Sequence, residues 1–425
     1  MDKSTLKQVI VDQRDVFFSQ KNLIKRDIAL DKFLQTKQVI VISGIRRCGK
    51  SSLLYLIHNE LELPGSQIIY FNLDDERLIH FEVEDFNKLY SLHIELFRPD
   101  LSKIVWLLDE VQNVFGWEKF VNRMYEKGMK LFVTGSNASL LNSEISASLT
   151  GRNMTIALMP FSFKEYLRFN HIFYQDSSLT TEQQAIIVNS FKSYVYLGGF
   201  PQVVQEDNKY LLESYYQDII YRDIVGRYAI QQTAELKNLT LYLSSNIGKL
   251  HSYRKLLAIS GLKSLSTLKN YLSYLESAYL FYFICKFDYA IKKQILNPKK
   301  TYISDTGFYG KIGYSASQDY GFVLENVVFL ALKRSGQSIY YHKNKYECDF
   351  VISQNNNITQ AIQVTAYMNN EETRNREIRG LSEAMHDYKL DTGYVLTEDE
   401  NSELQIENKK ILIMPVWKWL LEEGA

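Results

Sequence analysis

The 425-residue sequence predicts an α/β fold, in which buried parallel strands alternate with helices. Val39–Ile42 is an unbroken β-branched run, which is typical of a strand buried on both faces. Leucine and isoleucine then recur at helical spacing in "SSLLYLIHNEL", which begins at Ser51. A helix over 20–38 is expected to lead into the first strand. Further strands are expected at Ile68–Asn72, Ile104–Leu108 and Leu131–Val133.

The turn between the first strand and its helix has the spacing of a phosphate-binding loop. Gly44, four residues and Gly49-Lys50-Ser51 match G-x-x-x-x-G-K-[ST], in which backbone N–H groups surround phosphates. We expect Lys50 to reach the β and γ phosphates of ATP and the Ser51 hydroxyl to hold Mg²⁺. The alternative is a chance match in a polar turn, which the flanking strand and helix disfavour. The expected nucleotide contacts are Gly44, Ile45, Arg46, Arg47, Cys48, Gly49, Lys50, Ser51 and Ser52.

Polar residues also follow two later strands. The strand ending at Leu108 is followed by Asp109-Glu110, and parallel strands carry ligands at their carboxyl ends. We expect Asp109 to bind Mg²⁺ through its water shell and Glu110 to polarise the attacking water. Asn137 follows the next strand and is the candidate sensor of the γ phosphate. An asparagine in this position can also be only a turn residue.

Length and composition limit the number of domains and the cellular compartment. The length and the 46% hydrophobic content allow two to four domains with ample cores. No apolar run approaches the length of a membrane span, and the first residues lack a signal-type apolar region. The three cysteines are scattered, which favours a reducing cytosol and argues against a zinc cluster. The sequence therefore predicts a cytoplasmic protein without a membrane partner.

Five segments give a more specific indication. "SGIRRCGKSSLL", "LLDEVQ", "VTGSNASLL", "LTGRNMTIALMPFSFKEYL" and "GGFPQVV" resemble, in this order, the AAA-type ATPases that carry a C-terminal domain of unknown function. The resemblance implies a P-loop ATPase core with ATP and Mg²⁺, a helical lid, a winged helix and a restriction-endonuclease-like α/β domain. It also implies that Arg152 contacts nucleotide in its own subunit or from a neighbour, so a homo-oligomer is a possible assembly. A structural role is the alternative for Arg152. The corresponding domains are 1–169, 170–235, 236–304 and 305–425.

The third predicted domain combines a helical pattern with positive charge. Two short helices, the second ended by Gly261, precede a third helix in "STLKNYLSYLESAYL", with Tyr279 on its apolar face. Two strands follow around a basic connection, which is the order of a winged helix. Ten basic and two acidic residues between Lys249 and Lys300 give a local net charge of +8. DNA is the expected partner, and a solvated basic surface or a protein-binding face is the alternative. The candidate DNA contacts are Lys263, Lys269, Lys292 and Lys293.

The last domain contains most of a nuclease pattern. Glu325 lies on a predicted helix and Asp349 enters a predicted strand, as in restriction-endonuclease-like folds that collect carboxylates around Mg²⁺. The next strand has Gln363 and Thr365 where such folds carry an acid and a lysine. Because threonine has no positive charge, we predict a nuclease fold without nuclease activity. Lys343 or Lys345 could substitute for the missing lysine, and an ordinary α/β domain is the alternative.

Two functional hypotheses follow. In the first, the protein is an ATPase whose nucleotide state controls how a winged helix holds DNA. In the second, it is a signalling or defence ATPase in which ATP controls the binding of protein partners. Only the +8 segment separates the two, and it favours DNA.

Overall fold

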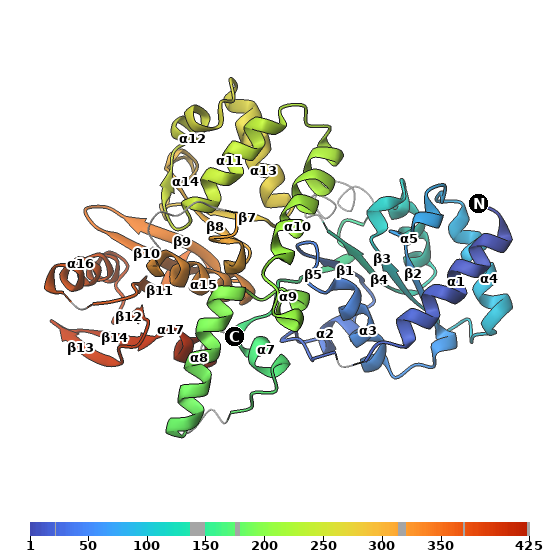
Figure 1. Ribbon diagram of the computed structural model, residues 1–425, viewed down its shortest axis with the longest axis horizontal. Helices are drawn as coiled ribbons and strands as arrows, with labels where there is room; N and C mark the ends of the chain where they lie inside the picture. The colour runs from blue at the N-terminus through green and yellow to red at the C-terminus, as the bar shows by residue number, and fades with distance from the viewer. Residues whose placement is uncertain (22, 137–148, 175–178, 313–319, 369, 423–425) are drawn as a thin grey trace. The chain divides into compact units, whose positions relative to one another are not determined.

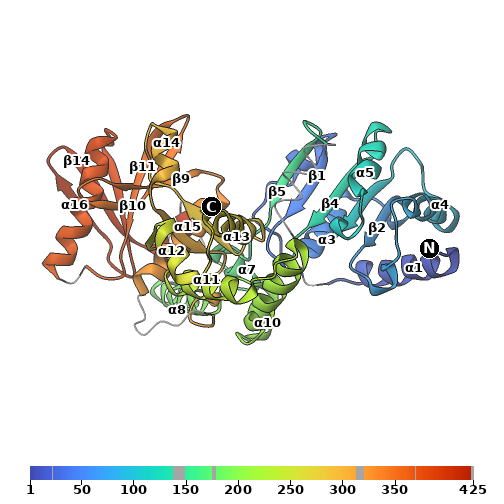
Figure 2. The ribbon, with the colours of Figure 1, turned by 90° about the horizontal axis from the view of Figure 1, so that it is seen from above.

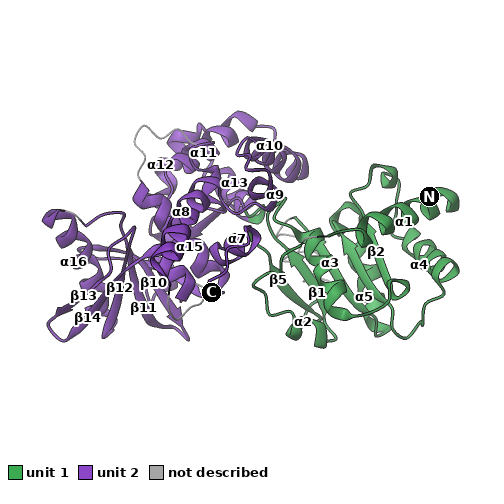
Figure 3. Ribbon diagram, turned by 60° about the horizontal axis from the view of Figure 1, so that its bottom comes forward, with its two compact units in different colours: residues 1–159, 277–279 green, residues 160–276, 280–425 purple. Residues whose placement is uncertain are grey.

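The computed structural model describes residues 1–425 except 22, 137–148, 175–178, 313–319, 369 and 423–425 (Figure 1). The chain divides into two compact units (Figure 3). Unit 1 contains Met1–Met159 with Ser277–Tyr279, and unit 2 contains Pro160–Glu276 with Leu280–Ala425. Unit 1 thus ends ten residues before the predicted limit of the first domain, and the division of unit 2 into three domains stays a prediction. None of the described helices is long and apolar enough to cross a membrane.

Unit 1 is built on a parallel sheet of order β2-β3-β4-β1-β5. Its strands are β1 (Val39–Ser43), β2 (Ile68–Asn72), β3 (Val105–Asp109), β4 (Lys130–Gly135) and β5 (Asn153–Ala157). The four predicted strands are confirmed. Strand β5 was not predicted, because only one residue of its sequence NMTIA is buried and an edge strand leaves no apolar run.

Helices cover the sheet of unit 1. They are α1 (Lys3–Phe18), α2 (Asp31–Gln35), α3 (Lys50–Leu61), α4 (Asp85–Phe97) and α5 (Trp117–Glu126). Helices α1 and α4 lie together beside β2 in both views (Figures 1 and 2). The helix predicted over 20–38 is wrong, since the described residues of this range form a helix only at α2. The segment before α2 instead brings Arg26 to two distant carbonyl groups, which a local pattern cannot indicate.

Unit 2 begins with helices, as predicted for 170–234. They are α7 (Phe163–Phe169), α8 (Thr181–Leu197), α9 (Pro201–Glu206), α10 (Leu211–Asp218), the π-type turns Ile219–Gly226 and α11 (Thr233–Ser245). The chain turns sharply between α8 and α9 at Gly198, whose φ is 83°. A Cβ atom there would lie 1.7 Å from the Asp305 carboxylate, so only glycine fits. The carboxylate also accepts a hydrogen bond from the Gly199 N–H at 2.7 Å.

The next part of unit 2 contains the second and third predicted helices, α12 (Tyr253–Ser260) and α13 (Leu265–Ser277), and the two predicted strands, β7 (Phe281–Ile284) and β8 (Lys299–Ile303). It also contains the unpredicted strand β6 (Leu250–His251) and the unpredicted helix α14 (Ile291–Leu296), and its sheet has the order β6-β8-β7. Gly261 ends α12, and the Ser264 hydroxyl accepts from the backbone at the start of α13. Tyr279 lies beyond α13 with a φ of 58°, so its predicted place on the helix face is wrong.

The terminal part of unit 2 is a mixed sheet of order β13-β14-β12-β11-β10-β9. Its elements are α15 (Tyr320–Arg334), β9 (Ser338–Lys343), β10 (Glu347–Gln354), β11 (Asn357–Val364), α16 (Glu371–Asp387), β12 (Thr392–Thr397), β13 (Ser402–Ile406), β14 (Lys409–Pro415) and α17 (Val416–Glu422). Helix α16 packs against β10, β11 and β12 (Figure 1). The predicted helix with Glu325 and strands around Asp349 and Gln363 are confirmed.

Candidate functional site

The predicted phosphate loop lies between the carboxyl end of β1 and the start of α3. Gly44 follows β1, and a Cβ atom there would lie 2.0 Å from the Leu158 carbonyl oxygen. Gly49 has a φ of 99° and precedes the first residue of α3, so it also takes a conformation that favours glycine. The first N–H groups of a helix have no partner within the helix, and the helix dipole favours negative charge there. The loop therefore has the backbone features of an anion site.

Lys50 is buried within this loop, with only 5% of its surface exposed. Its Nζ donates to the carbonyl oxygens of Gly44 at 3.2 Å and Ile45 at 3.4 Å. It also lies 3.6 Å from Glu110 Oε1, which is a long ion pair. An anionic ligand could replace these weak carbonyl contacts and would offer the ammonium shorter, charge-assisted hydrogen bonds.

Asp109 and Glu110 stand at the carboxyl end of β3, where Thr134 of β4 contacts both. The Thr134 hydroxyl donates to Asp109 Oδ1 and accepts from the Glu110 N–H at 2.9 Å. The Ser51 side chain also hydrogen-bonds Asp109. Glu110 has a φ of 52°, and Gln112 donates to its Oε2. The predicted lysine, serine and two acids are thus brought together at one edge of the sheet.

The two acids have different electrostatic environments. Burial raises the pKa of Asp109 to about 6, with a further rise from Glu110, although bonds from Ser51 and Thr134 oppose it. Burial also acts to raise the pKa of Glu110, but Lys50 and Gln112 outweigh it and the pKa lies below its usual value. Glu110 is therefore ionised near neutral pH. Burial destabilises the charged form of Asp109, and a cation bound beside it would stabilise that form.

These residues fit a complex of ATP with Mg²⁺. Mg²⁺ takes oxygen ligands from one or two protein groups together with phosphates and water. Ser51 and Asp109 supply such oxygens, and the raised pKa of the buried Asp109 carboxyl would return toward normal beside a cation. When bound, Mg²⁺ would neutralise charge on the phosphates.

Arg26 and Thr134 support the site without having been assigned a role from the sequence, and Cys48 contacts a different group from the one expected. Arg26 is buried and donates to the Cys48 carbonyl at 3.2 Å and to the Met159 carbonyl at 2.7 Å. The Cys48 thiol is also buried and points toward the Leu158 carbonyl at 3.4 Å, and burial raises its pKa. Cys48 thus contacts the strand end rather than a ligand through its side chain. Thr134 directly follows the strand predicted over Leu131–Val133, and this place at the carboxyl end of a strand was the signal that could have identified it.

Asn137 and Arg152 were also predicted to contact the nucleotide. Asn137 lies outside the described residues. Arg152 lies at the amino end of β5, where its carbonyl oxygen accepts from Val39 N–H, whereas the phosphate loop is at the carboxyl end of β1. Five-residue strands separate the two edges by roughly 13 Å. The Arg152 side chain instead pairs with Glu126 Oε1 at 3.0 Å. Arg152 is therefore too far from the phosphate loop to contact nucleotide in its own subunit. A contact with the nucleotide of a neighbouring subunit stays a prediction.

The predicted DNA-contacting lysines are on the surface of unit 2. Lys263, Lys269, Lys292 and Lys293 are all exposed. Lys293 lies 3.7 Å from Asp288. Lys300 does not belong to this surface, because it is buried and paired with carboxylates. Nine basic and two acidic residues then remain between 249 and 300, which gives a net charge of +7.

The terminal domain brings the predicted acids together but supplies an unexpected lysine. Glu325 Oε1 and Asp349 Oδ1 lie 3.0 Å and 2.8 Å from Lys300 Nζ. Gln363 accepts from the Asp349 N–H and donates to Glu377. Its amide therefore holds the backbone of Asp349 in place rather than binding Lys300. Thr365 donates to the Tyr367 carbonyl and brings no charge.

The two suggested substitute lysines do not fill the site. Lys343 is exposed and pairs with the rim acid Glu347, at 2.9 Å. The Lys345 ammonium lies over the Tyr346 ring. Lys300 is not among the predicted site residues, because its place in a run of basic residues indicates surface charge.

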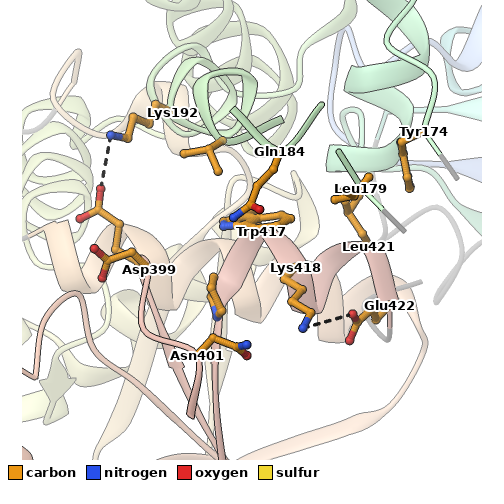
Figure 4. A pocket seen from close by; sticks show the side chains of 13 residues that line it. Tyr174, Leu179, Gln184, Lys192, Asp399, Asn401, Trp417, Lys418, Leu421 and Glu422 are labelled. Carbon is orange, nitrogen blue, oxygen red and sulfur yellow. Dashed lines mark ion pairs between the residues drawn. The ribbon is translucent and has the colours of Figure 1, made fainter. Parts of the chain in front are cut away.

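Unit 2 also contains an open pocket of about 610 Å³ between α8 and α17 (Figure 4). Trp417 and Leu421 contribute apolar surface. Its charged residues largely compensate one another, since Lys192 lies 3.9 Å from Glu398 and Lys418 lies 3.8 Å from Glu422. This balance gives the pocket no preference for a charged ligand.

Comparison with known families divides the chain into three successive matches. An AAA domain matches residues 36–167, a domain of unknown function (DUF8612) matches 188–318, and a domain of unknown function (DUF4143) matches 320–419. The first match contains the phosphate loop and the acids of β3. The last contains Glu325, Asp349 and the mixed sheet.

Relatives extend over the whole chain. An uncharacterized protein of Methanocaldococcus jannaschii is 34% identical over 99% of this chain and 96% of its own. An uncharacterized protein of Haemophilus influenzae is 33% identical over 78% of this chain and 84% of its own. The solved Aeropyrum pernix Orc1 protein in complex with DNA is 12% identical, with a TM-score of 0.31 over 68% of this chain and 93% of that one, which is too low to support an inference. The chain belongs to the AAA-type P-loop ATPase family whose members carry C-terminal domains of unknown function.

Proposed function

We propose that the chain binds ATP with Mg²⁺ and hydrolyses it in unit 1. The observation that carries this proposal is the grouping of Lys50, Asp109, Glu110 and Thr134 at the carboxyl ends of β1, β3 and β4. A phosphate loop, a metal-binding acid and an ionised acid beside them are the parts that phosphoryl transfer to water requires. Family membership supports the same conclusion.

Each side chain would have a separate task. Lys50 would exchange its contacts with the loop carbonyls for phosphate oxygens. Ser51 and Asp109 would hold Mg²⁺. Glu110 would orient the attacking water and accept its proton, because its lowered pKa keeps the carboxylate ionised. Thr134 would fix the relative positions of the two acids.

The direct test of this function is the replacement of Glu110. Glu110→Gln keeps the size of the side chain and removes its basicity, so kcat should fall by roughly 10²–10⁴. ATP affinity should change little, because Gln112 and Thr134 still hold the residue. Glu60→Gln, an exposed acid on α3, is the matched control and should retain full activity. Equal rates of phosphate release by wild type and Glu110→Gln would exclude the assigned base.

We further propose that DNA binds the basic surface of residues 249–300 and that nucleotide state alters this binding. The support is the net charge of +7 together with four exposed lysines, two of them on α14. The order of helices and strands there fits a winged helix. Counterion release by such lysines makes affinity depend steeply on salt.

A salt titration distinguishes DNA binding through phosphate contacts from non-specific adsorption. Lys292→Glu with Lys293→Glu should weaken binding to every duplex sequence and lower the slope of log affinity against log salt by roughly one unit for each phosphate that is no longer neutralised. Lys345→Glu with Lys389→Glu makes the same charge change on exposed residues elsewhere and should leave the slope unchanged. ATP hydrolysis without DNA should be unchanged in both proteins. Failure of wild type to bind DNA near 50 mM salt would refute the DNA proposal.

One observation favours the alternative of a protein partner. The connection around α14 exposes Tyr289, Ile291, Ile295 and Leu296, which are 57% to 78% accessible. The three aliphatic side chains have no group that binds a phosphate, but an exposed apolar patch is suited to a protein interface. A signalling or defence ATPase would use this surface to bind a partner under ATP control. Ile291→Ser with Leu296→Ser, which removes apolar surface without changing the charge, should then abolish partner binding and leave salt-dependent DNA binding unaffected.

A further inference from the structure

A lysine from the three-stranded sheet reaches the carboxylates of the terminal domain within unit 2. Lys300 Nζ on β8 lies 2.8 Å from Asp349 Oδ1, 3.0 Å from Glu325 Oε1 and 3.0 Å from Glu347 Oε1. Lys300 is only 1% exposed, and Glu325 and Asp349 are 3% and 5% exposed. The ammonium has three N–H donors, and each has a carboxylate partner available.

The other atoms of the carboxylates are also engaged. Asp349 Oδ2 accepts from the Val364 N–H at 2.9 Å, and Glu325 Oε1, which also contacts Lys300, accepts from the Tyr302 hydroxyl at 2.6 Å. A Cβ atom on Gly248 would lie 3.0 Å from Glu325 Oε2, so backbone covers this oxygen. The β9–β10 register shifts between Cys348 and Val351, which bracket Asp349, and such a bulge re-aims a side chain. Glu325 and Asp349 thus enclose the lysine, and the Glu347 side chain, which is 32% exposed, lies on the solvent side of the cluster.

The distances match an ammonium rather than a divalent metal. Oxygen ligands lie about 2.0–2.1 Å from Mg²⁺, so these carboxylates would have to move inward to bind it. Across the described ranges of the chain, no group of three or more His, Cys, Asp or Glu residues is arranged to hold a metal ion. Burial acts to lower the pKa of Lys300, but Asp349 and Glu325 raise it well above its usual value, so the lysine stays charged.

We propose that the Lys300 ammonium is a built-in cation that replaces the divalent metal of an endonuclease-like site. The terminal domain then binds no Mg²⁺ or Mn²⁺ at these carboxylates and does not cleave DNA by a metal-dependent route. The same ion pairs attach β8, which carries one end of the basic connection, to α15 and β10. The proposal concerns unit 2 alone and does not depend on ATP hydrolysis.

Mn²⁺ titration of the full chain without nucleotide tests this assignment. Lys300→Ala removes the ammonium and leaves three carboxylates around a gap, so it should gain one Mn²⁺ site per chain that binds roughly tenfold or more tighter than wild type. The gain should disappear in Lys300→Ala with Asp349→Ala, which also subtracts any weak binding at the phosphate loop. Lys299→Ala changes the neighbouring, half-exposed lysine and should behave as wild type.

Four results would contradict the proposal, and the fourth applies if Lys300→Ala does not fold. Wild-type binding of Mn²⁺ that Asp349→Asn abolishes would overturn it, as would Mn²⁺-dependent DNA cleavage that the same variant lacks. A folded Lys300→Ala protein that gains no Mn²⁺ site would also overturn it. Lys300→Met keeps most of the volume but leaves buried carboxylates unpaired, so its melting temperature should fall by roughly 10 °C. If Lys300→Ala does not fold, this measurement and the wild-type titration decide, and a Lys300→Met protein as stable as Lys299→Met contradicts the proposal.

Discussion

Each unit of the chain has a buried lysine beside acidic residues, but the two lysines are held in different ways. Lys50 lies 3.6 Å from the Glu110 carboxylate and donates to two carbonyl oxygens of its own loop. Lys300 lies within 3.0 Å of three carboxylates. Burial is similar, at 5% and 1% exposure, so burial does not separate their roles. The difference is the closeness of the counter-charges: Lys50 can still accept an anionic ligand, whereas Lys300 is already fully paired.

Each site also contains a buried acid whose pKa is raised. Burial raises the pKa of Asp109 to about 6, because hydrogen bonds and the nearby Lys50 oppose the effect of burial only in part. Burial and Asp349 raise the pKa of Glu325 to about 8 although Lys300 opposes the shift. The sites therefore differ in the distance of the lysine and not in the direction of the pKa shift: Lys300 lies within 3.0 Å of its carboxylates, whereas Lys50 lies 3.6 Å from Glu110. We expect changes in the first to affect ligand binding and catalysis, and changes in the second to affect stability.

The largest effect is expected from Lys50→Ala. Loss of the charge facing the β and γ phosphates should lower kcat/KM for ATP by roughly a thousandfold, or about 4 kcal/mol. The melting temperature without nucleotide should stay close to that of wild type, because the ion pair of Lys50 with Glu110 is long. Lys25→Ala, at a 77% exposed position of the same unit, is the control in steady-state ATPase assays. Wild-type ATPase activity in Lys50→Ala would contradict the assignment of Lys50 as the lysine that binds phosphate.

A pH-dependent effect of about 3 kcal/mol is expected from Asp109→Asn. The folded pKa of about 6 lies above the value near 3.9 of an exposed aspartate, so Asp109 contributes stability that is present below pH 4 and lost as pH rises through 6. Asparagine stays neutral, so the metal-free and nucleotide-free variant should be more stable than wild type at pH 8 and not at pH 4. Thermal melts at both pH values measure this. The same difference at both would mean that Asp109 is not a buried, uncompensated acid.

A smaller effect is expected from Thr134→Val. The change keeps the shape of the side chain and removes the hydroxyl that joins Asp109 to the Glu110 backbone. ATP turnover should fall roughly tenfold, equivalent to about 1–2 kcal/mol. Thr155→Val, on the exposed side of β5, should have no effect on turnover. Unchanged turnover in Thr134→Val would show that the two acids are positioned by other contacts.

The residues of the first site could be predicted because their pattern is local. The loop Gly44–Ser51 is one continuous segment, and the acids Asp109 and Glu110 are adjacent at the end of β3. The strand residues before each group are uniformly apolar. Strand β5 and the support from Arg26 could not be predicted, since an edge strand lacks an apolar run and Arg26 acts on carbonyls 22 and 133 residues away. The sequence therefore indicated the chemistry of the site and not the contacts that position it.

The second site shows the opposite case. Glu325 and Asp349 were predicted on the correct helix and strand, but their cation lies 25 and 49 residues away on β8. The basic pair Lys299-Lys300 was interpreted as surface charge because adjacent lysines usually are exposed. The alternation of a strand offered a signal, since Lys300 and the aromatic Tyr302 are two residues apart and share a face. Pairing between distant elements decided the environment of Lys300.

The central claim, that Lys50 binds ligand while Lys300 holds the fold, is tested most directly by thermal melts of Lys50→Ala and Lys300→Met with and without ATP and Mg²⁺. At a ligand concentration of about 100 times Kd, ATP should stabilise wild type and Lys300→Met by about 2.7 kcal/mol and leave Lys50→Ala nearly unchanged. Without ligand, Lys300→Met should melt well below wild type and Lys50→Ala close to it. A wild-type response of Lys50→Ala to ATP, or a wild-type melting temperature for Lys300→Met, would contradict the account.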